Sequence, residues 1–343
     1  GGGGGGEKER QGPIVQPELF VRCADFFLEN GQFAKAARML VAAGQPGRAL
    51  DLCVEHDVMV DEELAEAMTP SKDDTPGDHR TAVLIRIAKV CKRQGSFQLA
   101  AKKYTQAGEK AKAMKALIKS GDTEKVVFFA GVSRHKEIYL MAANYLQSLS
   151  WHSDAEIMRN IVQFLTKAQA PEALSKFYEA CAQIEIDEYR DYEKALQAMR
   201  ESYKCLSKSK LPDRDQHLES LNQRIQSIET FVRARQLMGS NPQEASALCA
   251  DLLDRIPFSQ DLDSGVRVGD VFAMLIEYHY QQRDAVTAYK LIEQMQRRGI
   301  VLSPYLDQHM VDEINKALGV EPADDPQRLY SRKATGGGGG GGG

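Results

Sequence analysis

Long apolar runs are absent from the chain of 343 residues. A membrane-spanning helix needs about 18 or more consecutive, mostly apolar residues, and the sequence contains no such stretch. No apolar segment follows a basic start either. We therefore expect neither a membrane-spanning helix nor a secretion signal in this chain.

Cysteine is scarce and scattered. The six cysteines stand singly, at Cys23, Cys53, Cys91, Cys181, Cys205 and Cys249. A disulfide framework would be denser, and a zinc ribbon would contain Cys-x-x-Cys pairs. Cys53 and His56 have the spacing of two ligands on one helical face, but no second pair at metal-ligand spacing exists. We predict reduced, mostly buried thiols and no metal site.

Catalytic and cofactor-binding motifs are missing as well. Residues 265–269 contain two glycines, but they lack the third glycine and the preceding strand of a phosphate-binding loop. Neither a Gly-x-Ser-x-Gly elbow nor a His-Glu-x-x-His motif occurs. We expect no catalytic residues, no cofactor and no enzymatic activity.

Glycine is concentrated at the two ends of the chain. Gly1–Gly6 and Gly336–Gly343 hold fourteen of the 28 glycines. Because polyglycine has high backbone freedom and buries no side chain, we expect disorder at residues 1–13 and in a tail at residues 321–343. The glycine runs can be either native or engineered. We expect the residues between them to be a piece of a longer protein. Between them we expect one helical array in two parts, at residues 14–130 and 131–320.

Internal repetition is the most informative feature that is present. The string FAKAARMLVAAG, from Phe33 to Gly44, returns 64 residues later as FQLAAKKYTQAG, from Phe97 to Gly108. The leading aromatic residue, the Ala-Ala pair, the large residue and the final Ala-Gly match in kind. Each string follows a glycine, and no segment of useful length alternates with the period of two that a strand requires.

The repeated unit predicts short helices that must stack. Apolar residues three and four apart form a stripe along one helical face. The large residues of the stripe fill gaps between helices, and a final glycine ends each helix without steric cost. These structural positions are Phe33, Leu40, Gly44, Phe97, Tyr104 and Gly108. Helices of about ten residues are unstable alone, so we predict an all-α, tetratricopeptide-like solenoid with Phe97 as a buried plug.

The charges are unevenly distributed, although the formal net charge is only −4. From Arg80 to Lys119 the chain has eleven lysines and arginines and one acid, and the preceding segment is acidic. In the helix expected near residues 111–119, the lysines left facing outward are Lys110, Lys112, Lys115 and Lys119. A solvated surface is the simpler interpretation. The alternative is a face that binds an acidic segment of a partner protein or phospholipid headgroups.

A second candidate surface is a coiled-coil pattern near the middle of the C-terminal half. Its apolar residues alternate spacings of three and four, and they are Leu218, Leu221, Ile225, Ile228 and Val232. The pattern covers little more than two heptads. A long helix packed on the array is the simpler interpretation, and the alternative is that a partner helix lies along this seam.

Three gapless strings resemble a known family. They are KALIKSGDTEKVVFFAGVSRHKEIYLMAANYLQSL at residues 115–149, FYEACAQIEIDEYRDYEKALQAMRESYKCL at residues 177–206 and DLDSGVRVGDVFAMLIEYHY at residues 261–280. These strings are similar to the C-terminal part of the intraflagellar transport protein 140 family, large subunits of intraflagellar transport complex A. The resemblance extends from about Pro17 to Leu318.

The resemblance carries expectations about architecture and function. Members of the family have N-terminal WD40 propellers followed by a tetratricopeptide-like array. The family implies a non-enzymatic scaffold in retrograde ciliary transport and in delivery of membrane proteins to cilia. It implies other complex A subunits as partners, and a location in the cytoplasm, the cilium or flagellum and the basal body. It transfers no catalytic residue.

One segment leaves a different function open. The string YKLIEQMQRRGIV, at residues 289–301, is similar to one pentatricopeptide unit, a class of RNA-binding repeat that reads one base per unit. No array with a period near 35 accompanies this unit, and the net charge is negative. We therefore expect no nucleic acid among the partners and keep RNA binding as the alternative.

Overall fold

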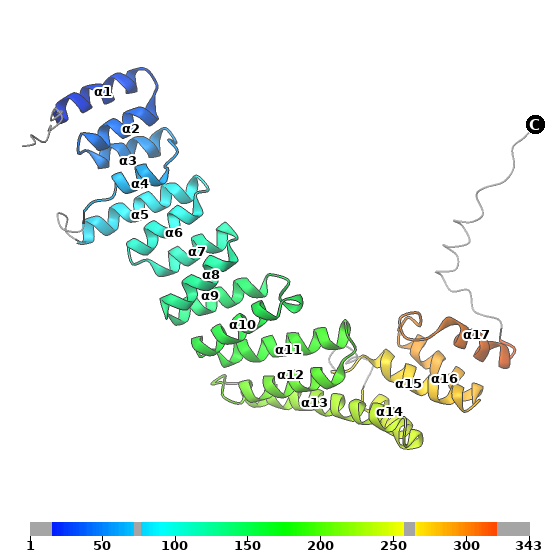
Figure 1. Ribbon diagram of the computed structural model, residues 1–343. Helices are drawn as coiled ribbons and strands as arrows, with labels where there is room; N and C mark the ends of the chain where they lie inside the picture. Colours follow the sequence, from blue (N-terminus) through cyan, green and yellow to red (C-terminus); the bar gives the residue numbers. More distant parts are fainter. Residues whose placement is uncertain (1–15, 72–76, 257–264, 321–343) are drawn as a thin grey trace, which may run out of the picture. The chain divides into compact units, whose positions relative to one another are not determined.

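The computed structural model describes residues 16–71, 77–256 and 265–320. Within these residues the chain folds into seventeen α-helices and one short 3-10 helix, with no strand (Figure 1). The all-α prediction is confirmed. None of the described helices is long and apolar enough to cross a bilayer. The ends predicted at residues 1–13 and 321–343 lie outside the described residues.

The chain divides into two units, which we call unit 1 and unit 2. Unit 1 ends at Ala170 and unit 2 begins at Pro171. The boundary expected between residues 130 and 131 falls instead inside one helix, α8 (Thr123–Ser133). That helix continues past Gly131, and its C-cap is Arg134, which adopts the left-handed conformation with φ of 51°.

Unit 1 is an array of short helices that lie side by side in chain order (Figure 1). They are α1 (Pro17–Glu29), α2 (Phe33–Ala42), α3 (Pro46–Glu55), α4 (Glu62–Ala67), α5 (Gly77–Arg93), α6 (Phe97–Gln106), α7 (Lys110–Ser120), α8, α9 (Lys136–Gln147) and α10 (Ala155–Ala168), with the 3-10 helix η1 (Trp151–Ser153) before α10. Most close packing joins helices that are neighbours along the chain. This is the pattern of a repeat array.

The 64-residue repeat corresponds to two copies of a three-helix motif, α1–α3 and α5–α7. Gly44 and Gly108 follow α2 and α6 with positive φ, as the repeat predicts. Leu40 and Tyr104 are buried at equivalent positions. Phe97, predicted as a buried plug, is less buried than expected. Phe97 is the first residue of α6, and its ring is only half-buried there, like that of Phe33 at the start of α2.

The repeat also contains a helix end, that of α3, which the glycine pattern of the sequence does not predict. Gly121 ends α7 in the left-handed conformation with φ of 72°. The equivalent position after α3, 64 residues earlier, is Asp57, which has a φ of 50°. Aspartate tolerates this conformation better than most residues because its short polar side chain can bond locally. Its carboxylate lies 3.5 Å from the Arg93 guanidinium of α5.

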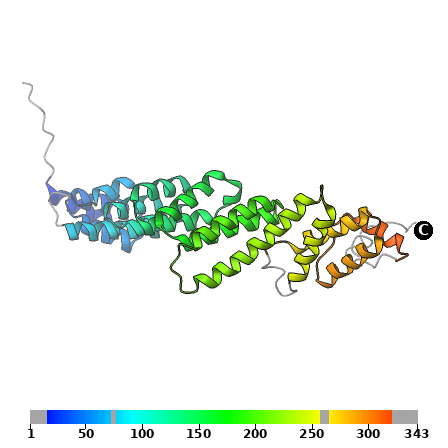
Figure 2. The same cartoon turned by 90° about the horizontal axis from the view of Figure 1, so that it is seen from below.

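Unit 2 consists of longer helices around one continuous apolar core. They are α11 (Pro171–Asp187), α12 (Tyr192–Leu206), α13 (Arg214–Leu237), α14 (Pro242–Arg255), α15 (Val268–Gln281), α16 (Ala285–Arg297) and α17 (Gln308–Ala317). The longest of them is α13, with 24 residues (yellow-green in Figure 2). It packs against both α12 and α14.

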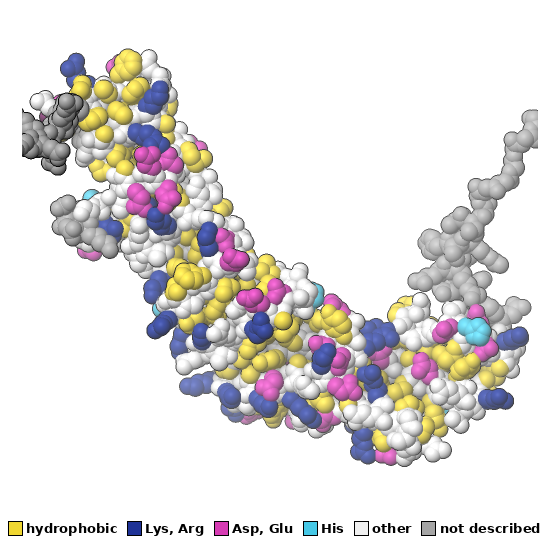
Figure 3. Space-filling model, in the orientation of Figure 1, with side chains coloured by type: hydrophobic (Ala, Val, Ile, Leu, Met, Phe, Trp, Pro, Cys, Tyr) yellow, Lys and Arg dark blue, Asp and Glu magenta, His cyan; other side chains and the backbone are white. Residues whose placement is uncertain are grey.

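The acidic and basic segments of unit 1 meet at α4. This helix has only six residues, too few to bury a long apolar stripe. Basic side chains from α2 and α6 flank its acids, and Figure 3 shows these opposite charges alternating along one face. Arg38 of α2 pairs with Asp61 and Glu63, and Lys102 of α6 pairs with Glu62 and Glu66, at 2.5 to 3.0 Å.

One lysine of α6 is fully buried at this junction. Lys103 is 0% exposed, and its Nζ lies 3.0 Å from Oε2 of Glu66 and 2.7 Å from Oγ1 of Thr69. Burial lowers the pKa of Lys103, because desolvation disfavours the charged ammonium. Hydrogen bonds from Lys102 and Lys103 lower the pKa of Glu66. The pair therefore holds α4 against α6 through the buried ammonium group of Lys103.

The Lys103–Glu66 pair can be tested by a double-mutant cycle. Glu66→Ala leaves a buried ammonium without its counterion, and we expect a loss of about 1–3 kcal/mol in the free energy of unfolding at pH 7. In a Lys103→Met background no charge is stranded, so the same change should cost less than about 1 kcal/mol. Urea denaturation measures both costs. Equal costs in the two backgrounds would contradict the pairing.

The same pair predicts a dependence of stability on pH. The folded-state pKa of Glu66 is lower than its unfolded value, so the folded state binds fewer protons than the unfolded state. The contribution of Glu66 to stability is thus present above its ordinary pKa of 4.5 and is lost as the pH falls through the lower, folded value.

Candidate interaction surfaces

The predicted lysine face lies on α7 with all four side chains exposed. Two of the four are engaged within the protein: Lys110 donates to the Ser133 carbonyl, and Lys112 pairs with Glu109 at 3.1 Å. Among the described residues, Lys115 and Lys119 have no hydrogen-bond or ion-pair partner. The part of the face that is open to a ligand is therefore Lys115 and Lys119. What it binds stays a prediction.

The seam on α13 is not open to a partner helix. Leu221, Ile225, Ile228 and Val232 are buried in the core of unit 2, and Leu218 packs partly buried against it. Helices α12 and α14 of the same chain pack on α13 and cover this stripe. The partner-helix alternative was wrong, because the apolar repeat that resembles a coiled coil is used for packing within the unit.

The cysteines behave as packing residues. All six are free thiols, and Cys53, Cys91 and Cys249 are buried. Burial raises the pKa of Cys53 and of Cys91 to about 11, so both thiols stay protonated at neutral pH. His56 does not join Cys53 in a metal site, because its ring stacks on Phe33 with ring centroids 3.8 Å apart. No cluster of three metal-ligating side chains occurs in the described parts of the chain.

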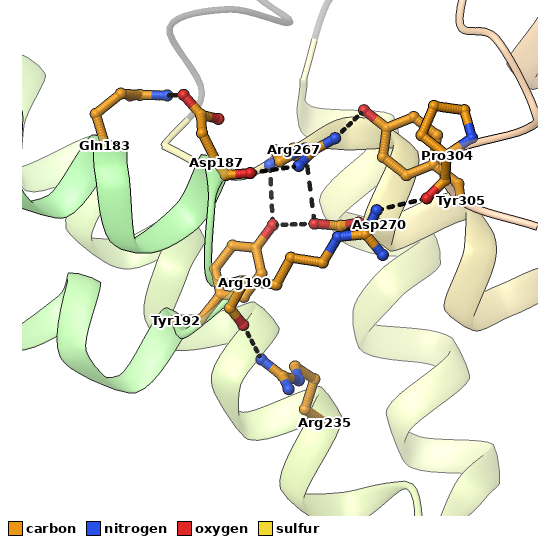
Figure 4. Close-up of polar contacts among 9 residues, drawn as sticks. All are labelled: Gln183, Asp187, Arg190, Tyr192, Arg235, Arg267, Asp270, Pro304 and Tyr305. Carbon is orange, nitrogen blue, oxygen red and sulfur yellow. Dashed lines mark hydrogen bonds and ion pairs between the residues drawn. The ribbon is translucent and has the colours of Figure 1, made fainter. Parts of the chain in front are cut away.

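Unit 2 contains a polar cluster that the sequence did not reveal (Figure 4). We define the polar cluster as Arg190, Tyr192, Arg267, Asp270 and Tyr305. It joins the turn between α11 and α12, the start of α15 and the turn that precedes α17. Its members are up to 115 residues apart, from 190 to 305, and no local spacing connects them.

Asp270 accepts the central hydrogen bond of the polar cluster. Its side chain is 9% exposed, and its Oδ2 accepts a hydrogen bond of 2.6 Å from the Tyr192 hydroxyl. Burial, followed by the charge of Asp270, raises the pKa of Tyr192, so the phenol stays protonated and remains a donor. The guanidinium groups of Arg190 and Arg267 lie 3.7 and 4.0 Å from the carboxylate and balance its charge.

The two arginines also hold Tyr305. They lie 5.5 Å and 4.9 Å from the centroid of its ring, within the range of cation–π attraction. Arg267 donates to the Tyr305 hydroxyl at 2.9 Å and to the Asp187 carbonyl at 3.1 Å, and Arg190 donates to the Pro304 carbonyl. Because its carboxylate and its donors find partners inside the protein, the polar cluster fastens two turns to the start of α15 and has the character of a structural lock.

A glycine makes room for this lock. A Cβ atom placed on Gly269 would lie 2.4 Å from Cζ of Tyr305, closer than packed atoms can approach. The tyrosine is fixed by its two arginines and cannot move away without losing those contacts. Gly269 is therefore required by the ring above it, although its own backbone conformation is helical.

Substitution at Gly269 tests the lock. We expect Gly269→Ala to lower the free energy of unfolding by about 1–3 kcal/mol, because the added methyl overpacks the ring. In a Tyr305→Ala background the clash is gone, and the same change should be nearly neutral. Chemical denaturation of the four proteins gives both differences. A strictly additive pair of effects would show that Tyr305 does not occupy this position.

Two family comparisons match consecutive parts of the chain. Residues 10–164 match the tetratricopeptide-repeat domain shared by intraflagellar transport proteins 140 and 172. Residues 172–296 match the C-terminal tetratricopeptide-repeat domain of intraflagellar transport protein 140. The matches meet where unit 1 gives way to unit 2. Most of the segment that resembles a pentatricopeptide unit, at residues 289–301, lies inside the second match, so RNA binding gains no support.

The matches and the fold agree with each other. Both matched domains are helical-repeat domains of a scaffold type, and the described residues contain helices without strands. The order of the two domains is also that of the two structural units. The chain therefore belongs to the intraflagellar transport protein 140 family and represents the C-terminal, tetratricopeptide-repeat region of its members.

Proposed function

We propose that the chain is a non-enzymatic scaffold segment of intraflagellar transport complex A. One observation carries the proposal: two tetratricopeptide-repeat domains of the family follow one another along the chain. The first falls on unit 1 and the second on unit 2, with α17 beyond the second match. Helical-repeat arrays bury one face of each helix against its neighbours and leave extended outer surfaces for other proteins. The partners proposed here are the other subunits of complex A.

The proposed role is in ciliary transport. As part of complex A, the scaffold serves retrograde movement in the cilium and the delivery of membrane proteins into it. It acts in the cytoplasm, at the basal body and in the cilium or flagellum. The protonated, buried thiols described above fit a scaffold, since they lack the nucleophilic thiolate of a catalytic cysteine.

The open part of the lysine face is the proposed docking point on α7. Lys115 and Lys119 are one helical turn apart and exposed, so their ammonium groups can reach two acids of one partner segment. We propose an acidic segment of another complex A subunit as the ligand. Phospholipid headgroups would use the same chemistry, and the experiment below separates the two sources.

Charge reversal on α7 tests this docking point. We expect Lys115→Glu combined with Lys119→Glu to weaken capture of one complex A subunit by roughly three- to tenfold, because two surface ion pairs are replaced by repulsion. Lys208→Glu combined with Lys290→Glu, two exposed lysines of unit 2, is the matched control. Quantitative mass spectrometry of complexes purified with the full-length protein measures the effect, and circular dichroism checks that helicity is unchanged.

The outcomes separate three interpretations. Unchanged capture with unchanged helicity would mean that the face is only solvated. Loss of binding to vesicles of phosphatidylcholine with phosphatidylserine, with capture intact, would assign the face to a membrane. If no complex A subunit purifies with the unaltered protein, the scaffold proposal itself fails.

A further inference from the structure

A groove of about 800 Å³ opens in unit 1 between the start of α4 and the helices α6, α7 and α8. Its apolar lining includes Phe97, Leu117 and Phe129. Phe128 lies at its edge with 71% of its surface exposed, and Val132, one turn later on α8, is 57% exposed. Figure 3 shows hydrophobic side chains gathered at the surface over α7 and α8. Exposed apolar surface of this kind typically marks a binding site.

The groove belongs to the second copy of the repeat and not to the fold in general. In the first copy, the His56 ring covers Phe33 in a stacked arrangement. The residue equivalent to His56, 64 positions later, is Ser120, which is too small to cover Phe97. The short helix after the first copy, α4, is acidic, whereas α8 after the second copy presents phenylalanines. Two changes at equivalent positions therefore remove the stacked ring and add phenylalanines beside Phe97, which is half-buried like Phe33.

Four polar side chains that line the groove are already bound within the protein. Lys102 is bound by Glu62 and Glu66, and Lys125 is bound by Asp122 and Gln98. The hydroxyls of Thr105 and Ser120 donate to carbonyls of their own helices. An extended peptide would leave its backbone N–H and C=O groups without partners here, and that is costly in an apolar site. An α-helix satisfies its own backbone and needs only apolar side chains to fill the groove.

The rim of the groove is acidic. On α8, Glu124 lies one turn before Phe128 on the same helical face, and it has no ion-pair or hydrogen-bond partner among the described residues. The charged residues that line the opening balance, because Asp61 and Glu62 stand against Lys102 and Lys125. The carboxylate of Glu124 therefore leaves a net negative charge at the rim. A ligand that carries lysine or arginine beside its apolar residues complements this rim.

We propose that the groove binds an amphipathic α-helix of a partner protein, with large apolar residues against Phe97 and Phe128 and basic residues toward Glu124 and α4. The acidic rim repels an anionic membrane surface, so a protein helix is the better match. This inference depends on the proposed scaffold role in one respect, namely that the occupant of the groove is another protein. The groove itself follows from the difference between the two repeat copies.

Site-specific photo-crosslinking identifies the occupant in the assembled complex. Benzoylphenylalanine replaces Phe128 in the full-length protein, expressed in ciliated cells, and the cross-linked segment is sequenced. The same label in place of Phe26, an exposed phenylalanine of α1 that is outside the groove, is the control for proximity alone. We expect the Phe128 label alone to capture a segment whose apolar residues recur three and four apart and are flanked by lysine or arginine.

Binding of that segment as a synthetic peptide then tests the contacts. Fluorescence anisotropy with the full-length protein should show about a tenfold or greater rise in Kd for Phe128→Asp and no change for Phe26→Asp. Glu124→Lys should also weaken binding, and added salt should reduce the difference between Glu124→Lys and the unaltered protein. Phe128 and Phe26 are both exposed, so both aspartate variants should keep the melting temperature of the unaltered protein.

Several results would overturn the inference. One is capture by the Phe128 label of lipid, of a second copy of this chain, or of an acidic or proline-rich extended segment. Another is equal cross-linking from positions 26 and 128. An absence of any Phe128-specific cross-link in an assembled complex would also contradict it. Failure of the protein to enter any complex would instead count against the scaffold function proposed above.

Discussion

Most helices in the described part of the chain depend on the burial of one apolar stripe against a neighbouring helix. In unit 1 the helices have between six and seventeen residues, lengths at which an isolated helix is marginal in water. Burial of a large side chain such as Leu40 or Met114 contributes roughly 1.5–3 kcal/mol, which offsets the cost of ordering its helix. Stability is therefore local, because each helix is completed by the helices beside it.

That constraint decides which surfaces remain for function. Apolar stripes that pack against a neighbouring helix are buried and cannot bind a partner, as the α13 seam shows. Only residues outside the stripes remain exposed to recognise other molecules. Where a helix is too short to carry a stripe, another interaction must replace it. The six-residue α4 is held by ion pairs from α2 and α6, including one with the buried Lys103. In unit 2, the polar cluster plays the corresponding part for two turns and the start of α15.

The regular part of the fold could be predicted from the sequence. Stripes with spacings of three and four and the glycines at Gly44 and Gly108 are local signals, so the repeat helices and their ends followed directly. The exposure of α7 lysines followed from the same periodicity. The end of α3 at Asp57 could not be predicted, because its left-handed conformation is adopted by an aspartate and not by the usual glycine.

The features that depend on contacts in space could not be predicted. His56 stacks on Phe33, whereas the residue equivalent to His56 in the second copy is Ser120, so that stacking has no counterpart there. This difference becomes apparent only when the two copies are aligned. The polar cluster joins Tyr192 to Asp270, 78 positions away. The boundary expected between residues 130 and 131 falls inside α8, and the units divide instead between Ala170 and Pro171.

Hydrogen exchange tests the local character of the stability most directly. Met114 is fully buried on α7, and Met114→Ala should cost about 2–5 kcal/mol. If each helix is completed by its neighbours, amide exchange measured by mass spectrometry should accelerate in α6, α7 and α8, and should keep its original rates in α1 and α2. Equal acceleration in all helices from α1 to α10 would contradict the account, because it would mean that unit 1 is stabilised as one indivisible core.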